Sequence, residues 1–203
     1  MVTEPDSSRR QQPKGDKRDR TRSKLLEAAR SLIREKGHEH ATLEAIAERA
    51  GMTTGAIYGN FKNREDLFIA LAQAYWAPIK PKVKEGATFA EVMHSIADAT
   101  IASFPDRQSV VIGRLTGMAY AIGNEEMRQR VLAVTRDSYA FGEEWLSSIV
   151  PPDQLPMPAA QLVRVLHVMI EGFTFQRLLT PELIPDETIQ VAFAALARTS
   201  TSQ

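Results

Sequence analysis

Apolar positions in the first third of the chain recur with the period of an α-helix. From Leu25 to Ile33 they occur at i, i+1, i+4, i+7 and i+8, and Gly37 then gives a helix-stop signal. A second run of the same period follows Thr42, a suitable N-cap, and ends at Gly51. The pattern therefore predicts a first amphipathic helix and a short second one.

The next segment, GMTTGAIYGNF from Gly51 to Phe61, has no continuous apolar stripe. Ile57 and Phe61 are predicted to anchor it inward, and Gly51 permits the tight turn before it. Small or polar residues are left facing outward: Thr53, Thr54, Ala56, Tyr58 and Asn60. An exposed helix with such side chains can enter the major groove of DNA, so this segment and the helix before it are predicted to form a helix-turn-helix unit.

A fourth helix is predicted from its N-cap Asn63 to Ala77, because Pro78 forbids continuation. At about 1.5 Å per residue, this helix is long enough to connect the helix-turn-helix unit to the rest of the chain as one rigid element.

The stretch TLEAIAERAGMTTGAIYGNFKNREDLF, preceded by RSKLLEAARSLIREKG, resembles the DNA-binding domain of the tetracycline-repressor (TetR) family. The similarity runs from Thr21 to Phe68. It implies a small all-α domain followed by a helical effector domain that dimerises, in a protein that most often acts as a ligand-released repressor.

The resemblance also implies roles for single residues. It places Thr42 at a DNA phosphate through the start of the second helix, and it places Tyr58 and Lys62 at the sugar-phosphate backbone. The residues expected to meet the major groove are Thr53, Thr54, Gly55, Ala56 and Asn60. Gly59 departs from the family pattern, since relatives often carry a bulkier residue there, and it is expected to weaken the recognition helix near its end.

Beyond Pro78 the resemblance fades, and only periodicity and composition remain. PIKPKVKEGAT is predicted to be a linker, and no period-2 alternation suggests a strand. Pro105 and other breakers delimit five further helices, at about residues 88–104, 106–122, 125–150, 158–179 and 186–198. The sequence thus predicts an all-α protein of about nine helices.

The last two predicted helices carry broad apolar faces, which suit a four-helix bundle across a two-fold axis. The candidate dimer-interface residues are Leu162, Val165, Leu166, Met169, Phe173, Ile189, Phe193 and Leu196. The alternative is that these faces close the core of the monomer itself.

Aromatic and methionine side chains are frequent between the predicted DNA-binding helices and the predicted dimer helices. Small-molecule pockets have such apolar walls with few polar anchors. The candidate ligand-binding residues are Trp76, Met93, Phe104, Met118, Tyr139, Trp145 and His167. The alternative is that they are ordinary core residues, because such side chains at helical spacing are more often buried packing.

The net charge of zero hides an asymmetry. Residues 1–66 hold 14 Lys and Arg against 11 Asp and Glu, and the remainder holds 11 against 14. The excess is densest in residues 1–24, so a basic flexible arm is predicted over residues 1–20, and Arg22 joins the candidate DNA-binding residues. The domains expected to follow are a DNA-binding domain over residues 21–66 and an effector-binding and dimerisation domain over residues 67–203.

Composition and residue spacing argue against several other classes of protein, enzymes among them. Cysteine is absent, which excludes disulfide scaffolds and thiolate chemistry, and the polar start lacks the apolar core of a signal peptide, so a cytoplasmic protein is expected. His38 and His40 share a loop without a carboxylate set at metal spacing, and no glycine-rich phosphate loop follows a strand. We therefore expect no enzyme activity, no catalytic residues, no metal and no cofactor.

These observations favour a dimeric DNA-binding transcriptional regulator, a repressor released from a palindromic operator by a small apolar or amphipathic ligand. The alternative is a DNA-binding regulator or architectural protein with the same DNA-binding domain, controlled by a protein partner or by no ligand.

Overall fold

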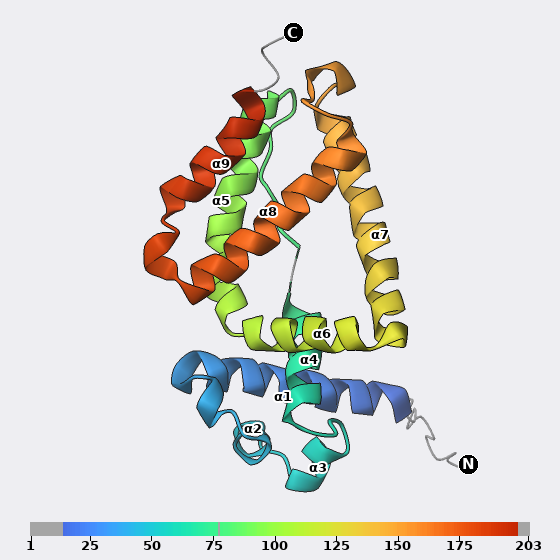
Figure 1. Ribbon diagram of the computed structural model, residues 1–203. Helices are drawn as coiled ribbons and strands as arrows, with labels where there is room; N and C mark the ends of the chain where they lie inside the picture. Colours follow the sequence, from blue (N-terminus) through green and yellow to red (C-terminus); the bar gives the residue numbers. More distant parts are fainter. Residues whose placement is uncertain (1–13, 77, 199–203) are drawn as a thin grey trace, which may run out of the picture. The chain divides into compact units, whose positions relative to one another are not determined.

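The computed structural model describes residues 14–76 and 78–198. Within these residues the chain forms nine α-helices and three short 3-10 helices, with no strand (Figure 1), which confirms the predicted all-α class. The chain divides into two compact units, Met1–Leu71 and Ala72–Gln203.

The first unit contains α1 (Lys14–Lys36), α2 (Leu43–Arg49), α3 (Thr54–Tyr58) and most of α4 (Arg64–Tyr75). The predicted N-caps are confirmed, since the Ala45 N–H donates to Thr42 Oγ1 at 3.1 Å and the Asp66 N–H donates to Asn63 Oδ1 at 2.8 Å. Gly51 has a φ of 64°, which explains why a glycine ends the turn between α2 and α3. Ala77, where the fourth helix was predicted to end, lies outside the described residues.

Helix α1 begins at Lys14, so the prediction of a flexible arm up to residue 20 is wrong for residues 14–20. These positions carry no apolar stripe, but Lys and Arg are good helix formers and a helix already nucleated by buried residues extends at low cost. Residues 1–13 of the predicted arm lie outside the described residues.

The core of the first unit joins all four helices. Its most completely buried side chains are Leu25, Ala29, Ile46, Ala47, Ile57, Phe61, Leu67 and Leu71. Arg64 closes one side: its Nε donates to the Ala41 carbonyl at 3.1 Å, another guanidinium nitrogen donates to the His38 carbonyl, and the group lies over the Phe68 ring. These contacts fix the 3-10 turn (His38–His40) between α1 and α2 against α4.

An exposed ion pair joins α2 to α1. Arg49 binds Glu35 through two hydrogen bonds of 2.5 and 2.6 Å, and the Ser31 hydroxyl donates to the same carboxylate. The Arg49 hydrogen bonds, with help from Ser31, lower the pKa of Glu35 to about 2.

We expect the carboxyl group of Glu35 to titrate with a pKa of about 2, which NMR of its carboxyl carbon measures. Because its folded pKa lies below the ordinary 4.5, its contribution to stability is fully present above pH 4.5 and is lost as pH falls towards 2. Arg49→Gln should return the Glu35 pKa towards 4.5. A Glu35 titration that does not respond to this substitution would contradict the assignment.

The second unit is built around α5 (Phe89–Gln108), which packs along α9 (Asp186–Arg198) and α8 (Ala159–Leu179). Helix α7 (Glu125–Ile149) packs on α8 and on α6 (Val111–Gly123). The core of the second unit consists of Phe89, Val92, Met93, Ile96, Ala97, Phe104, Leu146, Val150, Leu162, Leu166, Ile189 and Phe193. In the described part of the chain, no helix is both long and apolar enough to cross a membrane.

Helix α5 continues through Pro105, where the sequence predicted a break. Phe104 and Arg107, on either side of the proline, are both buried. Packing of these side chains outweighs the local penalty of about 3 kcal/mol for a helical proline. As a result α6 begins at Val111 instead of near residue 106.

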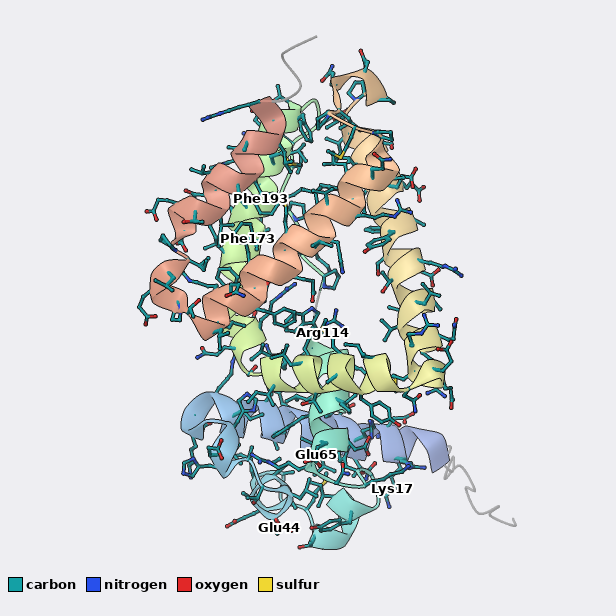
Figure 2. The ribbon with its side chains drawn as sticks, in the orientation of Figure 1. Lys17, Glu44, Glu65, Arg114, Phe173 and Phe193 are labelled. Atoms are coloured by element: carbon teal, nitrogen blue, oxygen red, sulfur yellow. The ribbon has the colours of Figure 1, made fainter. Side chains whose placement is uncertain are left out.

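The predicted dimer face is largely internal to one chain. Leu162, Leu166, Ile189 and Phe193 belong to the core of the second unit, so these four side chains are not available on its surface, and for them the alternative of a monomer core is correct. Val165, Met169, Phe173 and Leu196 are half-buried. Figure 2 labels Phe173 and Phe193 on adjacent helices, and their ring centroids are 6.1 Å apart.

Candidate functional site

Helix α3 presents its small side chains to solvent. Thr53 caps it, accepting from the Ala56 N–H at 3.2 Å, and Ile57 is the residue that buries it against the core. Thr53, Thr54, Gly55 and Tyr58 are exposed and Ala56 is half-buried. The helix ends at Tyr58 with Gly59 as its C-cap, in agreement with the expected weakening at Gly59.

The N-termini of α2 at Thr42 and of α3 at Thr53 are exposed. At such an end the backbone N–H groups and the helix dipole favour an anion, while the threonine hydroxyl can still donate its own proton. The contact of Thr42 with a DNA phosphate stays a prediction.

Tyr58 is half exposed, and its hydroxyl donates to Glu44 Oε1 at 2.9 Å (Glu44 is labelled in Figure 2). The pKa of Glu44 is lowered by its own backbone N–H and then by this hydroxyl, and the carboxylate in turn raises the pKa of Tyr58. A phenol has a single proton to donate. The hydroxyl therefore cannot donate to Glu44 and to a second acceptor at once.

Asn60 differs from its predicted outward orientation. Its amide nitrogen donates to the Ala56 carbonyl at 2.8 Å, and its Oδ1 is buried. Its backbone carbonyl accepts from Arg22 Nη1 at 2.9 Å, and the Arg22 guanidinium lies 4.4 Å from the centroid of the Phe61 ring. Arg22 thus fastens the segment after α3 to α1, a role that sequence spacing alone did not reveal.

A hollow of about 310 Å³ lies between α1 and α3, where Gly55 and Gly59 carry no side chain. Lys17, Arg18 and Thr21 of α1 line its other wall. Residues 17–20 were predicted to lie in a flexible arm, whereas α1 holds Lys17 and Arg18 beside α3. Lys62, a predicted backbone contact, is exposed, and its N–H donates to Asp66 at 3.0 Å.

In the second unit, charged groups surround Trp76 just after α4. Its Nε1 donates to Glu171 at 3.2 Å, its ring stacks on Phe175, and the guanidinium groups of Arg107 and Arg114 lie 4.5 and 5.4 Å from its ring. Arg114 also pairs with Glu171 at 3.4 Å.

Arg107 is the most deeply buried cation of this group. It is 5% exposed, and its Nη1 donates to the buried Thr174 hydroxyl at 3.1 Å. Burial, together with repulsion from Arg114, lowers the pKa of Arg107, while the Glu171 carboxylate opposes that shift. We call Trp76, Arg107, Arg114, Glu171 and Thr174 the Trp76 cluster.

Comparison with known proteins identifies the first unit. Residues 25–71 match the family model described as bacterial regulatory proteins, tetR family. Over these residues the chain is similar to the TetR family. The transcriptional repressor AcnR of Corynebacterium glutamicum is 37% identical over 84 residues, which cover 41% of this chain and 44% of that protein. The regulator TtgR of Pseudomonas putida is 45% identical over 51 residues, covering 25% of this chain and 24% of that protein.

The chain therefore spans less than half the length of these TetR-family relatives. A solved transcriptional regulator from Rhodococcus sp. RHA1 covers more: it is 17% identical with a TM-score of 0.57, over 87% of this chain and 94% of that one. At that identity the match shows a shared fold.

The predicted ligand residues of this chain occupy different environments. Met93 and Phe104 are core, and Trp145 packs against that core. Met118 is exposed, and Tyr139 meets His167 edge to face with centroids 5.3 Å apart. Trp76 lies in the Trp76 cluster. No group of three potential metal ligands occurs among residues 14–76 and 78–198.

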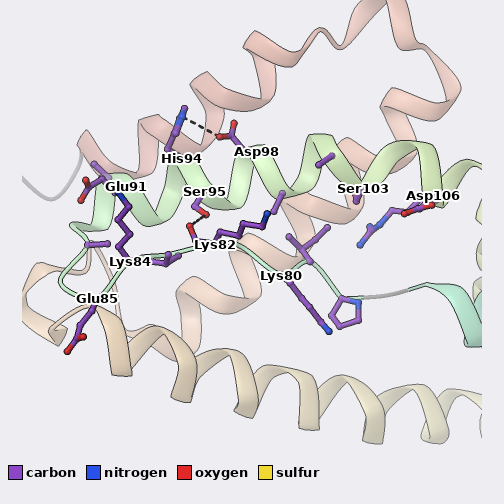
Figure 3. Close-up of a pocket in the computed structure, with 18 of the residues that line it drawn as sticks. Lys80, Lys82, Lys84, Glu85, Glu91, His94, Ser95, Asp98, Ser103 and Asp106 are labelled. Atoms are coloured by element: carbon purple, nitrogen blue, oxygen red, sulfur yellow. Dashed lines mark hydrogen bonds and ion pairs between the residues drawn. The ribbon is translucent and has the colours of Figure 1, made fainter.

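The second unit has a groove of about 960 Å³ between α5 and the segment 78–87 (Figure 3). None of the seven predicted ligand residues lines it. The sequence signal at this place is the three lysines of the linker, Lys80, Lys82 and Lys84.

Proposed function

We propose that this protein is a sequence-specific DNA-binding transcriptional regulator, a repressor that a small amphipathic ligand releases from a palindromic operator. The observation that carries the proposal is α3, a capped and exposed helix of small side chains held from behind by Ile57. Nothing bulky except Tyr58 separates its backbone from base edges in a major groove. The curated relative AcnR, named a transcriptional repressor, favours the same activity.

The proposed contacts divide into two kinds. Thr42, Tyr58 and Lys62, joined by Lys17 and Arg18, set the register on the sugar-phosphate backbone, whereas Thr53, Thr54, Gly55 and Ala56 meet base edges. No catalytic reaction is assigned to the chain, and the site of action is DNA in the cytoplasm.

The experiment is selection of duplexes bound by the full chain from a random pool. We expect a palindrome whose half-sites lie about one helical turn apart, bound roughly 1,000-fold or more tightly than unrelated DNA. Retained duplexes without a common sequence would favour an architectural role instead.

The homodimer that a palindrome requires is proposed to form through the exposed faces of α8 and α9. Exposed apolar side chains there are Val168, Leu179 and Val191, and Gly172, Ala194 and Ala195 are exposed beside them. Small residues let two helices approach closely, as a four-helix bundle across a two-fold axis demands.

Val191→Arg is expected to convert the dimer to a monomer, because it places a charge at the centre of that face. Light scattering coupled to size exclusion measures the mass. Val134→Arg is the control, since Val134 on α7 is similarly exposed (67% against 64%) but lies off the face. If both variants stay dimeric, the interface lies elsewhere.

Glu44→Gln is expected to tighten binding to all duplexes by about threefold to tenfold. The substitution removes a negative charge beside the proposed phosphate contacts and leaves the Tyr58 hydroxyl with a weaker, neutral acceptor, with which a phosphate competes more easily. Fluorescence anisotropy with specific and unrelated duplexes measures the effect, and Glu48→Gln, on the same helix, is the control. Loss of preference at a single base pair would instead make Glu44 a base-reading residue, since a carboxylate accepts from cytosine N4.

The effector response is proposed to act through the Trp76 cluster, since buried charged groups in a helical domain mark places where a ligand alters local energetics. Control by a protein partner is the second candidate, and the unpartnered apolar side chains Val131, Val134 and Phe141 on α7 favour it. Ligand-dependent release of the selected operator from the purified protein decides between them.

A further inference from the structure

The groove between α5 and the linker has the size of a small-molecule site. Its volume of about 960 Å³ is at the upper end of the range of about 300–1,000 Å³ for ligand pockets. One wall is α5, where Ala99 and Ala102 leave room, and the other is the linker, which contributes Ile79 and Val83. Tyr75, Pro78, Ser103, Asp106 and Arg107 line one end of it.

The charges that line the groove are not equally available. Two of its carboxylates are already engaged: Glu91 accepts from the N–H and hydroxyl of Thr88 at 2.8 Å, and Asp98 pairs with His94 at 3.4 Å. Lys80 and Lys82 form no ion pair within the described part of the chain. The other two carboxylates that line the groove are Glu85 and Asp106, so its cationic donors lie among acidic groups.

Lys82 and Lys80 differ in orientation although they are two residues apart. The Ser95 hydroxyl donates to the Lys82 carbonyl at 2.9 Å, which fixes the linker against α5 at this residue. In Figure 3 the Lys82 side chain extends along α5 towards the end with Ser103 and Asp106, whereas Lys80 points away from α5. Lys82 is the lysine directed along the groove.

Arg107 provides a buried charge at that same end. Its side chain lines the groove although it is only 5% exposed, and it stacks on Trp76 and donates to Thr174. Within the Trp76 cluster the Glu171 carboxylate pairs with Arg114 at 3.4 Å, and its charge also acts on Arg107. Arg114 Nε is buried and has no hydrogen-bond partner among the described residues. One more anion near these groups would be electrostatically favourable.

We propose that the groove binds an organic carboxylate, with the carboxylate held by Lys82 and Arg107 and the apolar body along Ile79, Val83 and Ala102. This inference rests on the proposed function only where it identifies the bound carboxylate as the effector that releases the protein from DNA. Charge-assisted hydrogen bonds to a buried guanidinium are stronger than those to a neutral donor, so the site selects the anion over its neutral amide.

Binding at Arg107 also provides a route to the DNA-binding domain. Arg107 contacts Trp76, which directly follows α4, and α4 begins at Arg64 in the first unit. A carboxylate that draws Arg107 off the indole changes the packing that holds the end of α4. Effector binding is thereby coupled to the helix that carries the recognition unit.

The test uses the full chain with the substitution Trp145→Phe. Because the sequence has two tryptophans, Trp76 is then the one that remains. Hexanoate and benzoate are titrated against their amides and against sodium chloride at matched ionic strength, with Trp76 emission and melting temperature as readouts. We expect saturable binding of at least one carboxylate, about tenfold or more tighter than its amide.

Two variants locate the site. Lys82→Gln should weaken carboxylate binding about fivefold to tenfold, while Lys80→Gln, which removes the same charge nearby, changes it less than about twofold. Ala102→Phe, at an exposed α5 position, should block the groove, and Ala133→Phe on exposed α7 is its control.

The proposal is overturned if no carboxylate changes Trp76 emission up to its solubility limit, if the amides bind as well, or if Lys82→Gln and Lys80→Gln behave alike. Operator binding by the same preparation is measured separately. Intact operator binding without carboxylate binding rejects the groove assignment alone, whereas failure to bind any preferred duplex rejects the proposed function whatever the groove binds.

Discussion

Arg22→Ala is expected to lower affinity for the selected operator by about 30-fold. The guanidinium donates to the Asn60 carbonyl and lies over the Phe61 ring, so it holds the segment that ends the five-residue helix α3. A hydrogen bond from a charged group contributes about 1.5 kcal/mol, and a cation–π contact contributes about 0.5–1 kcal/mol. If DNA binding needs the order that these two contacts impose, losing both lowers the affinity by a factor of about 30.

The salt dependence distinguishes this positioning role from a direct phosphate contact. If Arg22 acts through α3, the slope of log affinity against log salt stays unchanged in Arg22→Ala, because the number of neutralised phosphates is the same. Arg18→Ala, at an exposed position lining the α1–α3 hollow, should instead flatten the slope by about 0.9 with a smaller loss of affinity. A flattened slope in Arg22→Ala would return Arg22 to the list of phosphate contacts.

A conservative replacement sharpens the same test. Arg22→Lys keeps the charge but lacks the planar fork that serves the carbonyl and the ring together. We expect it to recover less than half of the lost binding free energy. Full recovery by lysine would show that charge alone matters at this position.

Local signals in the sequence predicted much of the DNA-binding unit. Thr42 and Asn63 are caps, which depend on residues only three positions away, and Ile57 and Phe61 are buried as helical period requires. The pairs Arg22–Asn60 and Tyr58–Glu44 join residues 38 and 14 positions apart, so no local pattern specifies them.

The second unit was less predictable for a related physical reason. An apolar helix face reports that a side chain is buried, but not whether its own chain or a second copy covers it, so Leu162 and Phe193 were assigned to a dimer face and belong to the core. The α5–linker groove was missed because it is lined by lysine, alanine and acidic residues instead of the aromatic residues on which the ligand prediction relied.

Glu171→Gln is expected to destabilise the second unit by about 3 kcal/mol. Glu171 pairs with Arg114 at 3.4 Å, its charge also acts on the buried Arg107, and its side chain is 15% exposed. Removing one partner of a buried ion pair leaves an uncompensated charge, at a typical cost of about 3–5 kcal/mol, and the partial exposure of Arg114 places this case at the lower end. For a chain of this size the melting temperature should fall by roughly 6–12 °C.

A second substitution tests whether charge imbalance is the cause. In Glu171→Gln the amide oxygen can still accept a hydrogen bond from Trp76 Nε1, as the carboxylate does at 3.2 Å. The substitution therefore removes the negative charge but not the hydrogen bond. Adding Arg114→Gln removes one of the two guanidinium charges and should restore more than half of the lost stability, although Arg114→Gln alone is also destabilising. Such a non-additive pair is the signature of groups in one network. If the two losses simply add, the Trp76 cluster is held by packing on Phe175 and not by its charges, and a bound carboxylate would then have no electrostatic route from Arg107 to the end of α4.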